Sequence, residues 1–401
     1  KSFGQIFFAW GMLCMSSRSW LLTPGLWVLR AASGTALGAP LDWVLKRTVF
    51  RHYCGGETLA DCHRVRRQLE ASQIKMVVDH SQEERERPED WEDNLASKKA
   101  LFRSVASEMS GSCKFIPLKV TSLMSPRLLE TVTSVVVKDA TWVGKLSDAV
   151  LSELREEDSQ LWLSSEQRLR HLCNVAREVG VSVWMDAEQS HRQPAIDILA
   201  QRLMREFNTN GQPPVLFNTY QLYLRDGDAR VLRDLKQASR EGYVFAAKCV
   251  RGAYMVSEAE RAEQHGSATA VHQDKTATDI AFDSAVKSMI EAIGRGEEAA
   301  LAICTHNELS VRRAISAMLS NNVPTTHPNI HFAQILGMCD NVTAALSTSG
   351  YNAHKLVLFG DYGDLFPWLL RRIDENRDML GGCQAERPVL WRAWTQRLRG
   401  Q

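Results

Sequence analysis

The sequence predicts an α/β protein built on an eight-stranded β/α barrel, a (β/α)8 or TIM-like fold, with an N-terminal helical extension. Three observations support this fold class: eight short apolar runs follow one another along the chain, amphipathic segments separate them, and polar side chains gather where the runs end. A doubly wound nucleotide-binding sheet could alternate in the same way, but its first strand should be followed by GxGxxG. The chain contains no such motif, so the barrel is favoured.

The eight runs have the length and β-rich composition of strands, and the segments between them have helical spacing. The expected strands are Lys75–Asp79, Phe115–Thr121, Val181–Asp186, Val215–Tyr220, Tyr243–Val250, Ala299–Thr305, Asn329–Gln334 and His354–Phe359. The expected helices are Ser164–Val179, Ala195–Phe207, Ala229–Arg240, Thr276–Ile293, Glu308–Leu319 and Tyr362–Glu375.

The barrel is expected to span residues 71–385, between an N-terminal helical segment (1–70) and a C-terminal helical tail (386–401). His52–Glu70 is the best amphipathic piece of the first segment. The apolar stretch Ile6–Met15 has about half of the roughly 20 residues that a spanning helix needs, so a helix packed on the main domain is favoured over a peripheral membrane contact. The strongly charged stretch Ser81–Ala100 is interpreted as a solvated loop and helix face.

Charge and cysteine usage exclude several classes of function. The net charge is +1, from 48 basic and 47 acidic side chains, so no electrostatic reason exists to expect a nucleic-acid partner. The nine cysteines include no CxxC pair, and HExxH is absent, so no metal site is expected. An odd number of cysteines fits reduced thiols in a non-secretory compartment.

Polar residues lie at or just past the C-terminal ends of six of the eight expected strands. In a β/α barrel these ends converge on one mouth, where the active site is built, so a shared site is favoured over solvated strand ends. The residues are Lys119, Asp186, Glu188, Asn218, Lys248, Arg251, Thr305, His306 and Gln334.

Two clusters have a chemical rationale of their own. In Lys248–Tyr254 (KCVRGAY), Gly252 allows close backbone approach to a bound group, and the two cations can face a phosphate or a reduced flavin. A strand-end turn with two surface cations remains the alternative. In the last helix, Arg371 and Arg372 are neighbours of Glu375 at helical spacing. One arginine could bind a substrate carboxylate while the other pairs with protein carboxylates, and an exposed helix salt bridge is the alternative.

A third cluster, Thr305–Asn307, closes the sixth strand around His306. A single histidine at a strand end is more often a structural hydrogen-bonding group than a general base. No serine or cysteine nucleophile is arranged beside it, so hydrolase chemistry is not favoured.

Read together, seven blocks resemble the proline dehydrogenase family, and they occur in the family's order from about residue 75 to residue 380. The blocks are FIPLKVTSL, WMDAEQS, VLFNTYQ, AAKCVRGAY, ICTHNE, FAQILGMCD and LLRRIDEN. The form is similar to the eukaryotic, single-function branch. The resemblance implies a distorted β/α barrel with bound FAD that oxidises L-proline to Δ1-pyrroline-5-carboxylate in proline catabolism. It also implies hydride transfer from the substrate to flavin N5 and passage of the electrons to a quinone.

The resemblance further implies roles for individual residues. Asp186 and Lys248 would be catalytic and close to the flavin. Lys119, Arg371 and Arg372 would hold the substrate carboxylate, Glu375 would orient one arginine, and Tyr254 and Leu336 would line the substrate pocket. The residues expected to contact FAD are Ala187, Asn218, Lys248, Arg251, Gly252, Ala253, Thr305, His306 and Gln334.

Two positions depart from the family pattern and bear on the substrate. Many members have tyrosine where this chain has Phe359 and Trp368, and both rings pack on the substrate. Relatives that oxidise trans-4-hydroxyproline need room or polarity near the hydroxyl, and two bulky apolar rings leave little, so proline is favoured over hydroxyproline. A catalytically silent barrel that serves as a binding partner is a further alternative, and the presence of the carboxylate-holding residues argues against it.

Localisation follows from the resemblance alone. The family's eukaryotic members imply a mitochondrial protein on the matrix side of the inner membrane, with peripheral association through the apolar N-terminal stretch. The chain begins at Lys1 rather than methionine, so a targeting peptide cannot be read from it.

Overall fold

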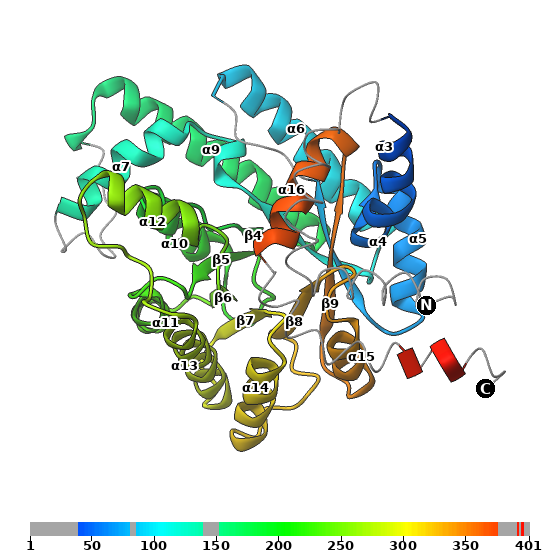
Figure 1. The fold of residues 1–401 in the computed structure, drawn as a ribbon. Helices are drawn as coiled ribbons and strands as arrows, with labels where there is room; N and C mark the ends of the chain where they lie inside the picture. Colours follow the sequence, from blue (N-terminus) through cyan, green and yellow to red (C-terminus); the bar gives the residue numbers. More distant parts are fainter. Residues whose placement is uncertain (1–38, 81–85, 139–151, 376–390, 393, 397–401) are drawn as a thin grey trace.

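Eight parallel strands close into a barrel, as the sequence predicts (Figure 1). The computed structural model describes residues 39–80, 86–138, 152–375, 391–392 and 394–396. The barrel strands are β2 (Lys75–His80), β3 (Cys113–Leu118), β4 (Ser182–Met185), β5 (Leu216–Gln221), β6 (Phe245–Val250), β7 (Ala299–Cys304), β8 (Ile330–Ile335) and β9 (Ala353–Phe359). Strand β9 pairs with both β8 and β2, which closes the ring and leaves these eight strands without a free edge.

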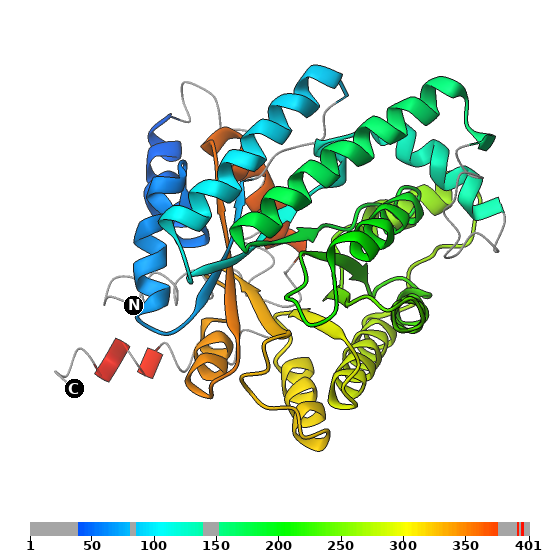
Figure 2. The ribbon, with the colours of Figure 1, turned by 180° about the vertical axis from the view of Figure 1, so that it is seen from behind.

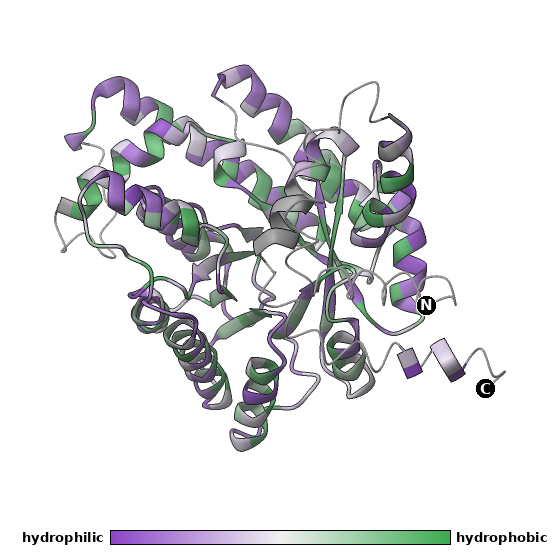
Figure 3. Ribbon diagram, viewed as in Figure 1, coloured by the Kyte–Doolittle hydropathy of each residue, from purple (hydrophilic) through white to green (hydrophobic). Residues whose placement is uncertain are grey.

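Helices surround the strands in both views (Figures 1 and 2). They are α3 (Ala39–Leu45), α4 (Arg51–Tyr53), α5 (Leu59–Glu70), α6 (Pro88–Glu108), α7 (Pro126–Lys138), α9 (Glu156–Val179), α10 (Gln193–Phe207), α11 (Gly227–Glu241), α12 (Met255–Gln264), α13 (Lys275–Gly294), α14 (Glu308–Ser320), α15 (Asp340–Thr348) and α16 (Tyr362–Glu375), with a π turn η1 (Lys46–Phe50) and a 3-10 turn η2 (Val120–Ser122). Figure 3 shows both hydrophilic and hydrophobic residues on these helices, as expected when one face packs on the barrel.

All six helices expected from apolar spacing are confirmed, and the sequence missed several others. The charged stretch after the first barrel strand forms the beginning of α6, while its residues 81–85 lie outside the described part. Helices α12 and α15 follow β6 and β8 and were not expected. None of the helices in the described ranges is long and apolar enough to cross a membrane.

The barrel interior is packed by side chains from all eight strands. One buried cluster contains Val77, Phe115, Trp184, Phe217, Ala246, Ala300, Ala302 and Ala333, with Cys304 and Leu356 packed against it. Large aromatic residues on β3, β4 and β5 and small alanines on β6, β7 and β8 therefore fill the lumen together. Because side chains alternate along a strand, this cluster also shows which positions of each strand point inward.

The expected helix over His52–Glu70 is wrong at its beginning. Residues Cys54–Gly56 form a short strand, β1, which pairs with β9 in register Cys54↔Leu358. A Cβ added at Gly55 would lie 2.4 Å from the Cys62 sulfur, so close packing with α5 requires a glycine there. Helix α5 starts only after Thr58, whose hydroxyl accepts from the Asp61 N–H in a reciprocal capping box.

The expected segment boundaries at residues 70 and 385 remain a proposal. Ile6–Met15, the stretch considered for membrane contact, lies outside the described residues. Most of the expected C-terminal tail does so as well, apart from short helical pieces at 391–392 and 394–396.

Candidate active site at the barrel mouth

Three of the expected site residues share the inner face of the barrel at its C-terminal end. Asp186, just past β4, lies two positions beyond the buried inward residue Trp184, and Lys248, on β6, lies two positions beyond the buried inward residue Ala246. Lys119 lies four positions beyond Phe115, at the point where β3 ends and the chain turns into η2. The period of two along a strand therefore directs all three charged side chains to the same mouth.

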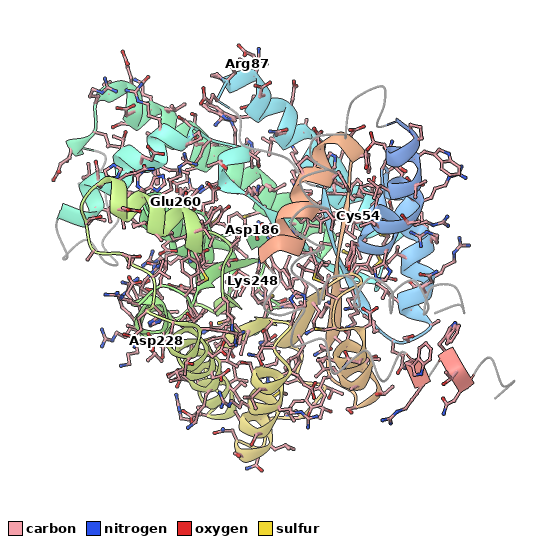
Figure 4. The ribbon with its side chains drawn as sticks, viewed as in Figure 1. Cys54, Arg87, Asp186, Asp228, Lys248 and Glu260 are labelled. Carbon is pink, nitrogen blue, oxygen red and sulfur yellow. The ribbon has the colours of Figure 1, made fainter. Side chains whose placement is uncertain are left out.

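Asp186 and Lys248 form a direct ion pair at the centre of this mouth (Figure 4). The Lys248 Nζ lies 2.5 Å from Asp186 Oδ1, and the side chains are only 12% and 26% exposed. The ammonium also lies 5.3 Å from the centre of the Trp184 ring, within range of a cation–π interaction. Figure 4 places the pair between the strands, while labelled residues such as Glu260 lie on the outer helices.

The pair fixes the charge state of Lys248. Burial alone would lower the pKa of this lysine, but the carboxylate of Asp186, with further contributions from Cys304 and Asp79, raises it above its ordinary value. Lys248 is therefore protonated at neutral pH. Burial raises the pKa of the neighbouring Cys304 thiol to about 12, so this cysteine is a neutral wall of the mouth.

Lys119 is a further cation at the mouth. Its side chain is half-buried, and no carboxylate lies within 4.0 Å of its Nζ among the residues that the structure describes. Its charge is nevertheless close enough to act on the pKa values of Asp79 and Glu188. A half-buried ammonium without a protein carboxylate is suited to bind an anionic group.

A second ion pair at the mouth was not predicted. Lys98, from α6, is 3% exposed and lies 3.7 Å from Asp79 at the end of β2. Its ammonium also donates to the carbonyl oxygens of His80 and Pro117, which ties α6 to β2 and β3. Burial raises the pKa of Asp79 and lowers that of Lys98. Asp79 could have been found in the sequence, because it lies two positions after the inward-facing Val77.

Arg251 is committed to protein partners. Its guanidinium donates to Asp279 at 2.7 Å, to the Thr305 hydroxyl at 2.6 Å and to the Ser310 hydroxyl at 2.6 Å. It also lies over the Phe282 ring. Arg251 therefore joins the end of β6 to α13 and α14, and it contributes to the mouth mainly by holding Thr305 in place.

Gly252 is required by the protein itself. Its φ is +101°, and an added Cβ would lie 2.1 Å from the Tyr223 ring. The expectation of close approach to a bound group therefore remains a proposal, because close packing against Tyr223 already explains the glycine. Ala253 and Tyr254 continue this turn with half-buried side chains, and Tyr254 packs against Tyr223 and Leu224. Ala187 is half-buried beside Asp186.

His306, Gln334 and Leu336 lie where β7 and β8 end. The backbone N–H of Ile335 donates to His306 Nε2 at 3.0 Å, and burial lowers the pKa of this histidine to about 3. The neutral ring therefore carries its proton on Nδ1. Gln334 is 2% exposed, and its amide donates to the Thr305 carbonyl and accepts from Thr343. Leu336 is half-buried and packs on the main core.

Two expected site residues point away from the lumen. Asn218 is fully buried, and its amide donates to Asp197 on α10 at 2.9 Å, because it is out of phase with the inward-facing Phe217 and Thr219. Phe359 is 7% exposed and stacks on His80, with ring centres 4.9 Å apart. The sequence placed Phe359 correctly at a strand end, but Asn218 lies in the middle of β5, and the facing of neither side chain could be predicted.

The expected carboxylate-binding residues of the last helix lie outside the described side chains. The backbone of α16 is described to Glu375, and the helix passes in front of the strands in Figure 1 and behind them in Figure 2. Its apolar face packs on the turn η1 and on Leu358 of β9. The side chains of Trp368, Arg371, Arg372 and Glu375 lie outside the described part.

The donor chemistry of the mouth fits a flavin. Lys119 and Lys248 supply positive charge, and the neutral His306 carries an Nδ1–H donor. The indole N–H of Trp184, buried against Lys248, has no hydrogen-bond partner in the described part of the chain. Cationic and N–H donors stabilise the negative charge of a reduced flavin, so the residues present suit this group.

Comparisons with known proteins agree on one family. A family model described as proline dehydrogenase matches residues 62–384. Hydroxyproline dehydrogenase of Bos taurus is 31% identical over 429 residues, which cover 100% of this chain and 92% of that protein. Mitochondrial proline dehydrogenase 1 of Homo sapiens is 35% identical over 252 residues, which cover 63% of this chain and 42% of that protein.

Solved structures share the fold. Proline utilization A from Bdellovibrio bacteriovorus superimposes with a TM-score of 0.70 at 20% identity, over 84% of this chain and 34% of that chain. A variant of the protein of that name from Bradyrhizobium japonicum gives a TM-score of 0.65 at 17% identity, over 88% of this chain and 34% of that chain. This chain thus spans about a third of the length of these structures.

Proposed function

Because this chain belongs to the proline dehydrogenase family, we propose that it is an FAD-dependent dehydrogenase that oxidises L-proline to Δ1-pyrroline-5-carboxylate. The observation that carries the proposal is the Asp186–Lys248 ion pair on the inner face of the mouth, beside Lys119, which has no carboxylate partner among the described residues. When bound, FAD would supply the acceptor for the hydride and its two electrons.

Each charged residue at the mouth would have a role that follows from its charge. Lys119 would bind the substrate carboxylate, since its ammonium is half-buried at the mouth. Lys248 would hold a positive charge beside the flavin, and Asp186 would keep that charge in place by raising the pKa of Lys248. Thr305, His306 and the Arg251 network would support the cofactor from the ends of β6 and β7.

Arg371 and Arg372 on α16 are proposed as further ligands of the substrate carboxylate, with Glu375 orienting one of them. The support is their match to the family pattern and the position of the α16 backbone over one end of the barrel (Figure 1). A planar guanidinium can bind a carboxylate through two parallel hydrogen bonds, which fixes the orientation of the substrate as well as its presence.

A second candidate substrate is trans-4-hydroxyproline. Two relatives that match 95% or more of this chain carry the name hydroxyproline dehydrogenase, which favours this imino acid, although a relative that matches 93% carries the name proline dehydrogenase 1. The sequence argument for proline relied on Phe359 and Trp368 as pocket walls, and Phe359 stacks on His80 instead. Phe359 therefore carries less of the argument for proline than the sequence suggested.

A direct assay separates these candidates. Flavin-loaded protein is incubated with L-proline or trans-4-hydroxyproline and a dye acceptor, and kcat/KM is compared for the two substrates. Failure to bind FAD, or absence of turnover with both imino acids, would refute the proposed function.

Replacing the dye by a ubiquinone analogue tests the proposed quinone acceptor. A mitochondrial location is proposed from the names of the relatives and is tested by fractionation.

The carboxylate role of α16 gives the first prediction. Arg371→Met should raise KM for the imino acid by roughly 10- to 100-fold, because a charge-assisted contact to the carboxylate is lost. Bound flavin, measured by its visible absorbance, should change little. Unchanged KM in this variant would contradict the proposed role. Arg312→Met is a matched control, since Arg312 lies on the exposed face of α14.

A further inference from the structure

Glu188 is less exposed than Asp186 in the loop that follows β4, and although its position predicts a place at the mouth, the proposed function gives it no role. It is 3% exposed and lies two residues after Asp186. Burying a carboxylate is costly unless several hydrogen bonds compensate for the lost hydration. The partners of Glu188 therefore indicate what the buried charge does.

The side chain of Glu188 binds the segment that carries Lys119. One oxygen, Oε1, accepts from the backbone N–H of Thr121 at 3.0 Å and from its hydroxyl at 2.9 Å. Thr121 belongs to η2, the turn that begins immediately after Lys119. The carbonyl of Lys119 in turn accepts from the hydroxyl of Ser122 at 2.7 Å. The turn after Lys119 is thus fastened to the loop after Asp186.

The backbone of Glu188 extends the same connection to other elements. Its N–H donates to Gln193 Oε1 at 2.8 Å, and its carbonyl accepts from Gln221 Nε2 at 2.6 Å. Gln221 ends β5, so three consecutive strand ends meet at this one residue. Arg192 lies 3.9 Å from the second carboxylate oxygen and 2.9 Å from Glu130 on α7. Glu188 is therefore a crosslink between β3, β4 and β5 at the mouth.

We infer that Glu188 is a positioning residue that holds Lys119 at a fixed place relative to the Asp186–Lys248 ion pair. The inference rests on the proposed function, in which Lys119 binds the substrate carboxylate and Lys248 lies beside the flavin. Lys119 and Asp186 come from different strand ends, and the crosslink through Thr121 joins the turns that follow them. A shift of the Lys119 turn would move the carboxylate site relative to the reacting ring carbon.

Hydrogen exchange at Thr121 tests the crosslink without any substrate. The amide of Thr121 donates to Glu188, so Glu188→Ala should speed its exchange by roughly tenfold or more in flavin-loaded protein. Glu188→Gln keeps an oxygen acceptor and should retain most of the protection. Glu166→Ala is the matched control, because Glu166 is a buried glutamate of α9 that pairs with Arg170 and Arg202 away from the mouth.

Binding of cyclopentanecarboxylate tests the positioning itself. This compound keeps the ring and the carboxylate but lacks the ring nitrogen, and its binding is followed by the flavin spectrum. In Glu188→Ala, its dissociation constant and the KM for the imino acid should both rise by roughly tenfold. Glu188→Gln should stay within about threefold of the parent, and Glu166→Ala should lose stability without a change in KM.

A milder pair of variants covers the case in which Glu188→Ala does not fold. Thr121→Val removes the hydroxyl bond and keeps the amide bond, whereas Thr121→Ser keeps both. Thr121→Val should raise KM by about threefold, and Thr121→Ser should leave it unchanged.

The outcomes distinguish this inference from the proposed function. Unchanged Thr121 exchange in Glu188→Ala, or faster exchange without weaker carboxylate binding, overturns the positioning role. A wild type that binds cyclopentanecarboxylate but oxidises neither imino acid refutes the proposed function alone, and the variants then decide the positioning role by binding. A wild type that neither binds the carboxylate nor oxidises either imino acid overturns both.

Discussion

At the scale of single residues, the charge of Lys248 depends on Asp186. The two atoms are 2.5 Å apart, and burial would otherwise lower the pKa of the lysine. Asp186→Asn should therefore reduce kcat/KM on the order of 100-fold, because a charge that is fixed beside the reacting group is lost or moved. The alkaline limb of the pH–rate profile should shift to lower pH, since Lys248 loses its proton more easily without Asp186.

The pH–rate profiles of the parent, Asp186→Asn and Glu260→Gln together decide this prediction. Glu260 is an exposed residue of α12, so its replacement removes the same charge from the outer surface. An alkaline limb that is identical in all three proteins would show that Asp186 does not set the charge of Lys248.

A second prediction at this scale concerns Gly252. The positive φ of this residue strains any other L-amino acid, and a Cβ would also clash with Tyr223. Gly252→Ala should therefore lower the free energy of unfolding by about 2–4 kcal/mol, which urea melts can measure. Gly266→Ala is the control, because Gly266 also has a positive φ but has no atom within 4 Å of the added Cβ. Equal losses in the two variants would mean that the contact with Tyr223 is unimportant.

At the scale of elements, Arg251 joins strand β6 to helices α13 and α14. Arg251→Met should cost about 2 kcal/mol of stability in flavin-free protein, because hydrogen bonds to Asp279, Thr305 and Ser310 are lost. Measuring the flavin-free protein separates this structural effect from any contact with the cofactor.

Lys275→Met is the natural comparison for this variant. Lys275 binds the same Asp279 from the exposed side of α13, so its loss should cost at most about 1 kcal/mol. If Arg251→Met were no more harmful than Lys275→Met in urea melts, the bonds to Thr305 and Ser310 would not hold the elements together.

Element identities were predictable where the local pattern was strong. All eight barrel strands were predicted from short β-rich runs, and the helix Tyr362–Glu375 was predicted with the bounds that the structure gives. The error at β1 has a local cause. Gly55 and Gly56 interrupt an otherwise amphipathic stretch, and glycine has a low helix propensity. Helices α12 and α15 were missed, and they are short, with ten and nine residues.

At the scale of the whole molecule, a buried histidine pair should make the fold sensitive to acid. His331 and His354 lie in the barrel interior against Phe115, and their ring nitrogens are 3.2 Å apart. Burial lowers the pKa of His354 to about 3 and that of His331 well below its ordinary value. Both histidines are therefore neutral in the folded protein at pH values where the unfolded chain binds protons.

The sign of the pH dependence follows from this difference. Because the folded pKa is lowered, the stabilising contribution is present above the unfolded pKa of about 6.5 and is lost as the pH falls towards the folded value. Each buried histidine should cost about 1.4 kcal/mol of stability between pH 7.5 and 5.5. In urea melts, His354→Asn should reduce the loss of unfolding free energy between pH 7.5 and 5.5 by that amount, whereas replacing the exposed His265 should not. An unchanged slope in His354→Asn would contradict the neutral pair.

The sequence by itself determined the barrel, the order of its strands and which strand ends carry charge. These features follow from local periodicity and from the spacing of polar residues, which the chain displays directly. It also placed Asp186, Lys248 and Lys119 among the polar residues of one mouth, because the C-terminal ends of barrel strands converge.

Only the tertiary structure decided which side chains point into the mouth and what each one contacts. The outward facing of Asn218 and Phe359, the commitment of Arg251 to three protein partners and the crosslink at Glu188 all depend on residues far apart in the chain. The phase of a strand around its axis is set by the packing of the whole barrel, so a one-residue difference that is invisible in a motif moves a side chain to the opposite face.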